Sequence, residues 1–172
     1  MMNEEIDNIL TISSIVNGIE YEVNKKKGNG AAVVYLKGGH YIGDVYIWDD
    51  GSWYFGDTIN NYAHGFGIFV ETIVSGTALY MKYVGEFKDG QFNGKGVLRN
   101  VDGEHYKGEF VKGWRHGKGV TYFNNGIIEN GNYIYGCPDG WCKHIYGKKR
   151  GGRQGYTIYY NMGNIKQYGE FL

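Results

Sequence analysis

Small and hydrophobic residues alternate with polar ones in short segments along most of the chain. In the segment Tyr83–Phe87, two aromatic residues and a glycine fall on one side of an extended backbone, whereas Val84 and Glu86 fall on the other. Because successive side chains of a strand point to opposite faces, this alternation predicts a β-strand with one packed face. Segments of this kind recur, so the pattern predicts a chain of short strands.

Residue pairs that favour tight turns separate these segments. Asp-Gly and Asn-Gly pairs tolerate the positive φ angles of two-residue hairpin turns. Turn signals spaced about 8–12 residues apart are typical of an antiparallel β-meander. The pairs that carry this prediction are Asn17-Gly18, Asp50-Gly51, Asp89-Gly90, Asn93-Gly94, Asp102-Gly103, Asn125-Gly126, Asn130-Gly131 and Asp139-Gly140.

The segments belong to a repeat with a period of 23 residues. Residues 83–105 (YVGEFKDGQFNGKGVLRNVDGEH) align with residues 106–128 (YKGEFVKGWRHGKGVTYFNNGII), with identities throughout both copies. One hairpin of this length buries too little surface to be stable alone. We therefore expect the copies to fold together as a stack.

Copies on either side of these two are less regular. Residues 54–82 form a third copy that contains six additional residues. In the copy that follows residue 128, Glu129 stands where a tyrosine begins the other copies, and Cys142 replaces the second glycine of the Gly-x-Gly pair. The repeat domain is predicted to span residues 18–172.

The repeated pattern resembles the MORN repeat (membrane occupation and recognition nexus), which is close to YxGxxxxGxxxGxGxxxxxxGxx. Residues 83–105 and 106–128 match it strongly, and residues 54–82 match it well. The resemblance implies an all-β fold, an elongated single-layer antiparallel β-meander with one hairpin per repeat, curved into a groove. It also implies a non-catalytic binding or scaffolding module that presents a curved sheet to another protein. An accessory subunit of an enzyme is an alternative, because such repeats resemble segments attached to kinases and methyltransferases.

Residues 1–17 depart from the repeat. Their hydrophobic residues Ile6, Ile9, Leu10 and Val16 are spaced for one face of a helix. We expect a short helical cap over the first edge strand, and an additional short strand is the alternative.

Glycines and tyrosines are expected to pack together. Gly94 and Gly96 share one face of a predicted strand and leave a strip of bare backbone there. An aromatic ring from an adjacent strand is the natural occupant of such a strip. We therefore expect the tyrosines that begin the three best copies, Tyr54, Tyr83 and Tyr106, to pack over glycine.

Composition excludes several other classes of protein. The 172 residues include 30 Gly, 17 Tyr and one Pro. Each Gly weakens a helix interior by roughly 1 kcal/mol, so a mainly helical fold is excluded. Collagen requires far more Pro, and zero net charge with 42% hydrophobic residues argues against disorder. With no signal-peptide pattern and no membrane-span pattern in the sequence, we expect a cytoplasmic protein.

Zero net charge conceals a basic cluster near the C-terminus. Between Trp141 and Tyr168 there are basic residues and no acidic one. Basic residues interleaved with aromatic ones favour contacts with an anionic phospholipid surface, and so a protein peripheral to a membrane. A solvated hairpin is the alternative, and nucleic acid is a less favoured partner. The cluster, in residues 143–153, consists of Lys143, Lys148, Lys149, Arg150 and Arg153.

No catalytic constellation is visible in the sequence. The Gly-x-Gly pairs are repeat glycines, because none extends to a phosphate-binding GxGxxG or GxxxxGK[ST] motif. No serine lies in a GxSxG motif, and Cys142 with His144 lacks an orienting residue. We therefore expect a protein that is not an enzyme and binds no cofactor.

Cys137 and Cys142 flank Pro138-Asp139-Gly140, which favours a turn. The cysteines could face each other across a hairpin and form a disulfide. With His144 they could also supply three ligands of a metal site, but a structural zinc site requires four. Burial as small hydrophobic side chains is the interpretation that we prefer.

Trp114 and Arg115 are candidate contact residues. The repeat equivalents of Trp114 are Tyr62 and Gln91, so the position does not require a core aromatic. An exposed Trp beside an Arg suits a binding surface.

The C-terminal residues predict an open sheet edge. Residues 167–172 (QYGEFL) resemble the first strand of a repeat and carry Tyr168, Phe171 and Leu172. Native edge strands are usually blunted by Lys, Pro or a bulge, and this segment has little such protection. We expect two of these edges to pair in a homodimer with two-fold symmetry. Fraying, or a fold-back onto residues 156–160, is the alternative.

Overall fold

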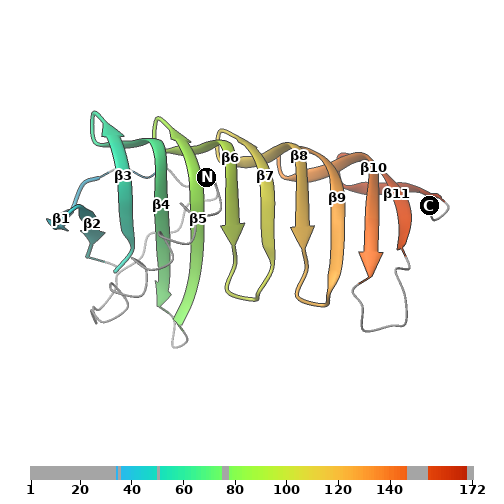
Figure 1. The fold of residues 1–172 in the computed structure, drawn as a ribbon, viewed down its shortest axis with the longest axis horizontal. Coiled ribbons are helices and arrows are strands. Elements are labelled where there is room, and N and C mark those ends of the chain that lie inside the picture. The colour runs from blue at the N-terminus through green and yellow to red at the C-terminus, as the bar shows by residue number, and fades with distance from the viewer. Residues whose placement is uncertain (1–33, 35, 50, 75–77, 147–154, 170–172) are drawn as a thin grey trace, which may run out of the picture.

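The protein is one antiparallel β-sheet whose strands follow chain order. The computed structural model describes residues 34, 36–49, 51–74, 78–146 and 155–169. This part of the chain contains twelve strands and no helix, and the sheet has no crossover (Figure 1). The predicted all-β meander is therefore confirmed, whereas the helical cap predicted for residues 1–17 lies outside the described residues. The strands are β1 (Gly39–Ile42), β2 (Val45–Trp48), β3 (Trp53–Ile59), β4 (Tyr62–Val74), β5 (Ala78–Lys88), β6 (Gln91–Arg99), β7 (His105–Val111), β8 (Trp114–Tyr122), β9 (Ile127–Ile134), β10 (Cys137–Tyr146), β11 (Gly155–Asn161) and β12 (Asn164–Gly169).

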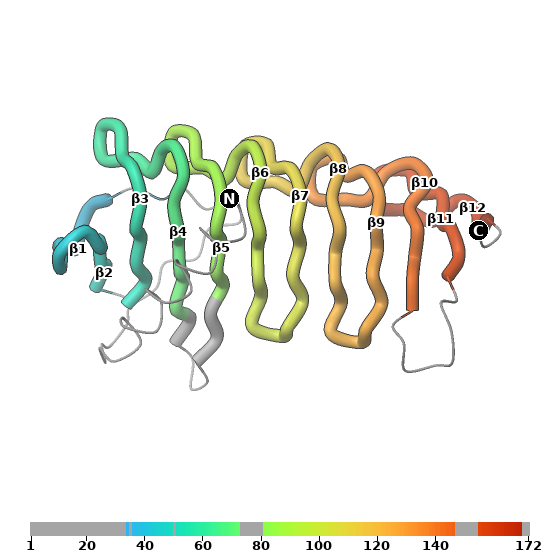
Figure 2. Tube along the Cα trace, viewed as in Figure 1, coloured from blue at the N-terminus to red at the C-terminus, as the bar shows by residue number. Residues whose placement is uncertain are grey.

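Each of the best repeats forms one hairpin, as predicted. The hairpins β3–β4, β5–β6 and β7–β8 correspond to the copies that begin at Tyr54, Tyr83 and Tyr106. The additional residues of the first copy lengthen β4 and β5, whose pairing continues to Val74↔Ala78. The strands lie side by side along the long axis, so the chain runs from one end of the molecule to the other (Figure 2).

The hairpin turns are not all where the turn pairs predict them. Five hairpins of the described sheet have two-residue turns in which both residues have positive φ, as type I′ turns require. Only one of these is a predicted pair. The pairs Asn93-Gly94, Asn130-Gly131 and Asp139-Gly140 lie within β6, β9 and β10, so the prediction of turns there is wrong. The observed turns are Asn60-Asn61, Asp89-Gly90, Lys112-Gly113, Tyr135-Gly136 and Met162-Gly163.

Within the strands, the first glycine of each Gly-x-Gly pair forms a bulge. Gly94 has a φ of +62°, and its equivalents Gly65 and Gly117 have +63° and +60°. The register of β5 and β6 shifts between Gly85 and Phe87, opposite this position. Such a conformation strains any residue with a Cβ, which explains why glycine recurs here. Beyond the bulges, the hairpin tips curl over along one long edge of the sheet (Figure 2).

Backbone hydrogen bonds join each tip to the one before it. The N–H of the second turn residue donates to a carbonyl just after the preceding turn. Gly113 donates to Phe92 at 2.8 Å, and Gly136 donates to Arg115 at 2.8 Å. The hairpin tips therefore form a continuous edge in which each tip is hydrogen-bonded to the one before it.

Seven glycines line up in register across β3–β9, and tyrosine rings cover all of them except Gly131, which lies under the Cys142 sulfur. A Cβ on Gly96 would lie 2.6 Å from a ring carbon of Tyr83. The Tyr83 hydroxyl donates to the carbonyl of Glu86 at 2.9 Å, and Tyr54 and Tyr106 make the same bond to the carbonyl three residues ahead. Tyrosine packing over glycine is confirmed at these positions. The glycine row is Gly56, Gly67, Gly85, Gly96, Gly108, Gly119 and Gly131.

The bulge glycines are covered differently from the prediction. The carboxylate of Glu86 lies over Gly94, and its Oε1 accepts the N–H of Lys95 at 2.9 Å. The expectation of an aromatic ring over Gly94 is wrong, because the bulge points this glycine toward the opposite strand's acidic residue.

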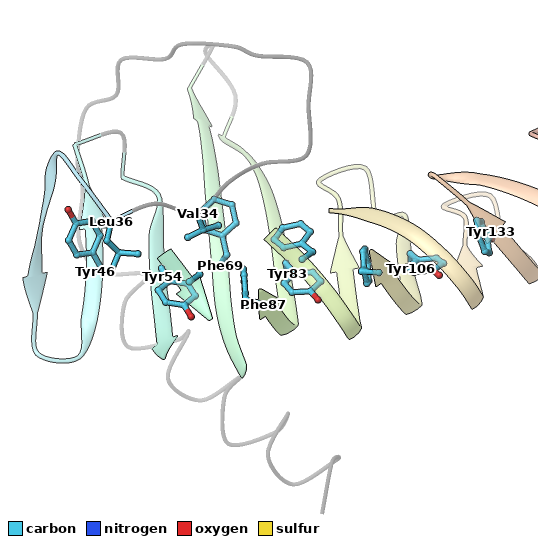
Figure 3. Close-up of a cluster of buried hydrophobic side chains, with 12 residues drawn as sticks. Val34, Leu36, Tyr46, Tyr54, Phe69, Tyr83, Phe87, Tyr106 and Tyr133 are labelled. Atoms are coloured by element: carbon cyan, nitrogen blue, oxygen red, sulfur yellow. The ribbon is translucent and has the colours of Figure 1, made fainter. Parts of the chain in front are cut away.

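The rings between the sheet and the tips form a continuous aromatic spine (Figure 3). Successive rings contact edge to face, with centroids 5.1–5.3 Å apart. Every ring of the spine is 3% exposed or less. In spatial order, the spine is Tyr54, Phe87, Tyr83, Phe110, Tyr106 and Tyr133.

Candidate functional site

One residue of the predicted basic cluster lies in the described chain. Lys143 is exposed on β10, where it pairs in register with Asn130 of β9 and Thr157 of β11. The flanking residues Cys142 and His144 are buried on the spine side, so Lys143 projects from the opposite face of the sheet. The other members, Lys148, Lys149, Arg150 and Arg153, lie outside the described residues.

Arg115 is engaged inside the molecule. Its guanidinium forms an ion pair with Glu104 at 2.8 Å and lies 5.1 Å from the ring centroid of Tyr106. Another of its nitrogens donates to Thr121 Oγ1 at 3.5 Å. The side chain is mostly buried, and all of these contacts lie within the molecule. Arg115 therefore holds neighbouring residues in place rather than pointing outward to contact a partner.

Trp114 is 46% exposed and lies at a hairpin tip. Its ring packs against Gly136 of the next turn, which fixes it on the surface. Other large apolar side chains are exposed at the tips, and we call this set the hairpin-tip ridge. The ridge consists of Ile59, Tyr62, Val111, Trp114, Tyr135 and Met162.

The C-terminal edge differs in part from the prediction. Residues 167–169 end β12, the second strand of the β11–β12 hairpin, rather than beginning a new repeat. β12 is exposed along its length, and Tyr168 is 67% exposed. Phe171 and Leu172 lie outside the described residues.

A buried polar network lies beneath β8–β11, and no sequence motif predicts it. Glu129 Oε1 accepts the Tyr133 hydroxyl at 2.7 Å, and Glu129 Oε2 lies 3.0 Å from Nε2 of His144. The Tyr133 oxygen is also 2.7 Å from Thr121 Oγ1, which therefore donates to it. On the far side, the Tyr160 hydroxyl lies 3.1 Å from the same His144 nitrogen. All five side chains are buried.

The network favours the ionised form of Glu129. Burial by itself raises the pKa of this carboxyl, but hydrogen bonds from His144, Tyr133 and Tyr160 outweigh it, so the pKa is lowered. Burial, with a smaller contribution from the nearby carboxylate, raises the pKa of Tyr133 and Tyr160. The two hydroxyls therefore keep their protons and remain donors.

A family comparison now identifies the repeats. A model of the MORN repeat matches residues 83–105 and, separately, residues 106–128. The chain contains MORN repeats. A comparison with curated proteins finds no match. MORN repeats are in general associated with binding or scaffolding and are typically non-enzymatic.

The polar network replaces the aromatic core of the preceding repeats of this chain. Counted from the turns, Glu129 takes the place of Tyr106, and His144 takes the place of Leu98. Cys142 takes the place of a row glycine, and its sulfur occupies the space above Gly131. A tyrosine at position 129 would have no bare backbone to cover, so the two replacements belong together. Alignment of the copies reveals both replacements, Glu129 and Cys142, but it does not reveal that Glu129 contacts His144.

The prediction that Cys137 and Cys142 could face each other across a hairpin is wrong. Both lie on the single strand β10, so Pro138-Asp139-Gly140 is not a hairpin turn and the cysteines do not face each other. Both thiols are free. Burial raises the pKa of the Cys142 thiol to about 11, so it is an inert core group.

The described residues contain no group of three or more His, Cys, Asp or Glu side chains that could hold a metal ion. Within the same residues, no helix is long and apolar enough to cross a membrane.

Proposed function

We propose that the protein is a non-catalytic module that binds another protein along the hairpin-tip ridge. The observation that carries this proposal is the exposure of Trp114 and Tyr135 on neighbouring tips. Aromatic side chains held in place before binding lose little conformational entropy and are frequent anchors of protein interfaces. The hydrogen bond from Gly136 to Arg115 joins the two tips and keeps their spacing.

The test compares two exposed tryptophans. Trp114 lies on the ridge, whereas Trp141 is 50% exposed on the strand face beside Tyr159. We expect Trp114→Ala to weaken binding of an affinity-captured and purified partner by at least about tenfold, and Trp141→Ala to leave it nearly unchanged. Equal losses in both variants, or an unaffected Trp114→Ala, would contradict the ridge as the binding surface.

The second candidate function is recognition of anionic phospholipid through residues 143–153. Exposed Lys143 supports it, together with the absence of acidic residues between Trp141 and Tyr168. Each basic residue near an anionic surface contributes about 1 kcal/mol, and salt weakens this attraction.

Vesicle flotation at two salt concentrations tests lipid recognition. Changing Lys148, Lys149, Arg150 and Arg153 to Gln should abolish binding to anionic vesicles. The matched control changes four exposed lysines elsewhere, Lys95, Lys107, Lys112 and Lys118, to Gln and should retain binding. Wild-type protein that ignores anionic vesicles at low salt would end this hypothesis.

An accessory role in an enzyme complex would use the same surfaces. In that case the partner captured through Trp114 would itself be a catalytic subunit.

A further inference from the structure

The buried core changes from aromatic to polar along the sheet. From β3 to β8, tyrosines cover the glycine row; the apolar residues Phe69 and Leu98 pack beside them in the first two copies, and Thr121 takes that place in the third. From β9 onward, Glu129 and His144 take the equivalent positions. Glu129 is the only buried carboxylate among the described residues. Folding of the β9–β12 end therefore depends on the protonation state of one residue in a way that the β3–β8 part does not.

Every element packed against Glu129 directs polar groups toward it. Among these groups, Arg115 is the one with a permanent charge, and it is neutralised by Glu104 and reaches the network only through Thr121. No second buried acid in the described chain could accept the donors in place of Glu129. The facing groups are Thr121 and Arg115 from β8, Tyr133 from β9, Cys142 and His144 from β10, and Tyr156 and Tyr160 from β11.

An ionised carboxylate suits this arrangement and a protonated one does not. The ionised group only accepts hydrogen bonds, and charge-assisted bonds of this kind are roughly twice as strong as neutral ones. A protonated Glu129 would place its own O–H among donors and lose the charge that attracts His144.

We propose that acid opens the array from its β9–β12 end while β3–β8 stay folded. In a repeat array each hairpin contacts only its neighbours, so one end can open without the rest. The buried aromatic spine up to Tyr106 contains no carboxylate, and the tip hydrogen bonds that join β3–β8 do not titrate in acid. The carboxylate over the bulge in β6, that of Glu86, is exposed to solvent rather than buried.

The direction of the effect follows from the carboxyl group. Because the folded pKa of Glu129 is lowered, its ionisation stabilises the β9–β12 end fully above the ordinary value of 4.5. This stabilisation is lost as the pH falls through the lower folded value. Opening is therefore expected below pH 4.5.

Hydrogen–deuterium exchange of the full chain, read by mass spectrometry at neutral pH and at about pH 3.5, tests the proposal. After correction for intrinsic exchange rates, amides of β9–β11 should lose more protection in acid than amides of β5–β8, by up to about tenfold for one carboxyl at one pH unit below its ordinary pKa of 4.5. Equal losses in the two parts, or a larger loss in β5–β8, would overturn the proposal.

Three variants separate Glu129 from other acidic groups. Glu129→Gln cannot titrate, so the additional acid response of β9–β11 should disappear. Tyr133→Phe removes one donor and keeps the ring, since Phe110 fills the equivalent position, and it should move the opening midpoint to higher pH. Glu109→Gln changes an exposed carboxylate that lies over the bulge glycine Gly117 and outside the network, so the acid response of β9–β11 should stay as in wild type.

These variants also protect the test against misfolding. If Glu129→Gln does not fold, Tyr133→Phe still reports on the carboxylate through its midpoint. An unchanged midpoint in Tyr133→Phe, or loss of the acid response in Glu109→Gln, would overturn the assignment to Glu129.

Discussion

At the scale of single residues, tyrosine and glycine specify each other in this fold. The Tyr83 ring occupies space that a Cβ on Gly85 or Gly96 would require, and its hydroxyl satisfies the carbonyl of Glu86. The ring therefore needs bare backbone on two adjacent strands, and that backbone needs a ring to exclude water. Where Cys142 fills the strip, the tyrosine is replaced as well, by Glu129. Substitutions in this row are thus expected to act through their neighbours.

Gly96→Ala should destabilise the fold by about 1–3 kcal/mol, because its methyl group would overlap the Tyr83 ring. The backbone of Gly96 has no positive φ, so the effect reports packing alone. Urea unfolding measures it. Gly126→Asn is the control, because a Cβ there meets nothing within 4 Å and Asn tolerates its φ of +85°. A neutral Gly96→Ala would show that the ring is not held against the strip.

Burial of tyrosines predicts a loss of stability in alkali. Burial is the main cause that raises the pKa of Tyr54 and Tyr83 above the ordinary value of 10. A raised folded pKa means that the stabilisation is complete below pH 10 and falls as the pH rises above it, because the unfolded chain loses protons first. Urea midpoints should therefore decrease above pH 10, and less steeply in Tyr83→Phe. Parallel curves for both proteins would contradict this prediction.

At the scale of elements, the repeat predicts the hairpins better than the turn pairs predict the turns. Asn93-Gly94 has the local preference of a hairpin turn, yet Gly94 forms a bulge inside β6. The turn instead lies at Asp89-Gly90, where the Gly90 N–H reaches the carbonyl of Ala63 in the preceding tip. Contacts between hairpins decide between two local signals, and a single sequence does not reveal those contacts.

Lys112→Asn should stabilise the fold by about 1 kcal/mol. Lys112 has a φ of +49° in its turn, which is unfavourable for Lys and tolerated by Asn. The side chain is exposed, so the change removes no core contact. Thermal or urea unfolding measures the gain. Asp89→Asn at the equivalent position should have almost no effect, and a destabilised Lys112→Asn would show that the lysine makes a contact that outweighs its backbone strain.

At the scale of the whole molecule, the sequence predicts the stack but not the change in its core. Alignment of the copies shows that Glu129 departs from the pattern, and burial of that position follows from its neighbours. The alignment does not show that Thr121, Glu129 and His144, on three different strands, converge on one network. The cysteine pair illustrates the same limit, because a local turn signal at Pro138 is overridden by strand pairing along β10.

β12 is an open edge of the sheet through which two molecules could associate. In the described part of the chain, β12 pairs only with β11, and its exposed side chains include Ile165 and Tyr168. Exposed apolar edge strands tend to pair with another chain, and two-fold dimers are the commonest oligomers. We therefore expect a homodimer in which two β12 strands pair antiparallel.

Light scattering coupled to size exclusion, over a dilution series, decides between dimer and monomer. Tyr168→Lys should convert the dimer to a monomer, because a charge on the edge opposes pairing. Phe171→Lys extends the test to the predicted edge beyond the described residues. Tyr135→Lys places the same charge on the hairpin-tip ridge and should leave the dimer intact. A wild-type protein that is monomeric at every concentration would exclude this interface, and dissociation by Tyr135→Lys instead would move it from β12 to the ridge.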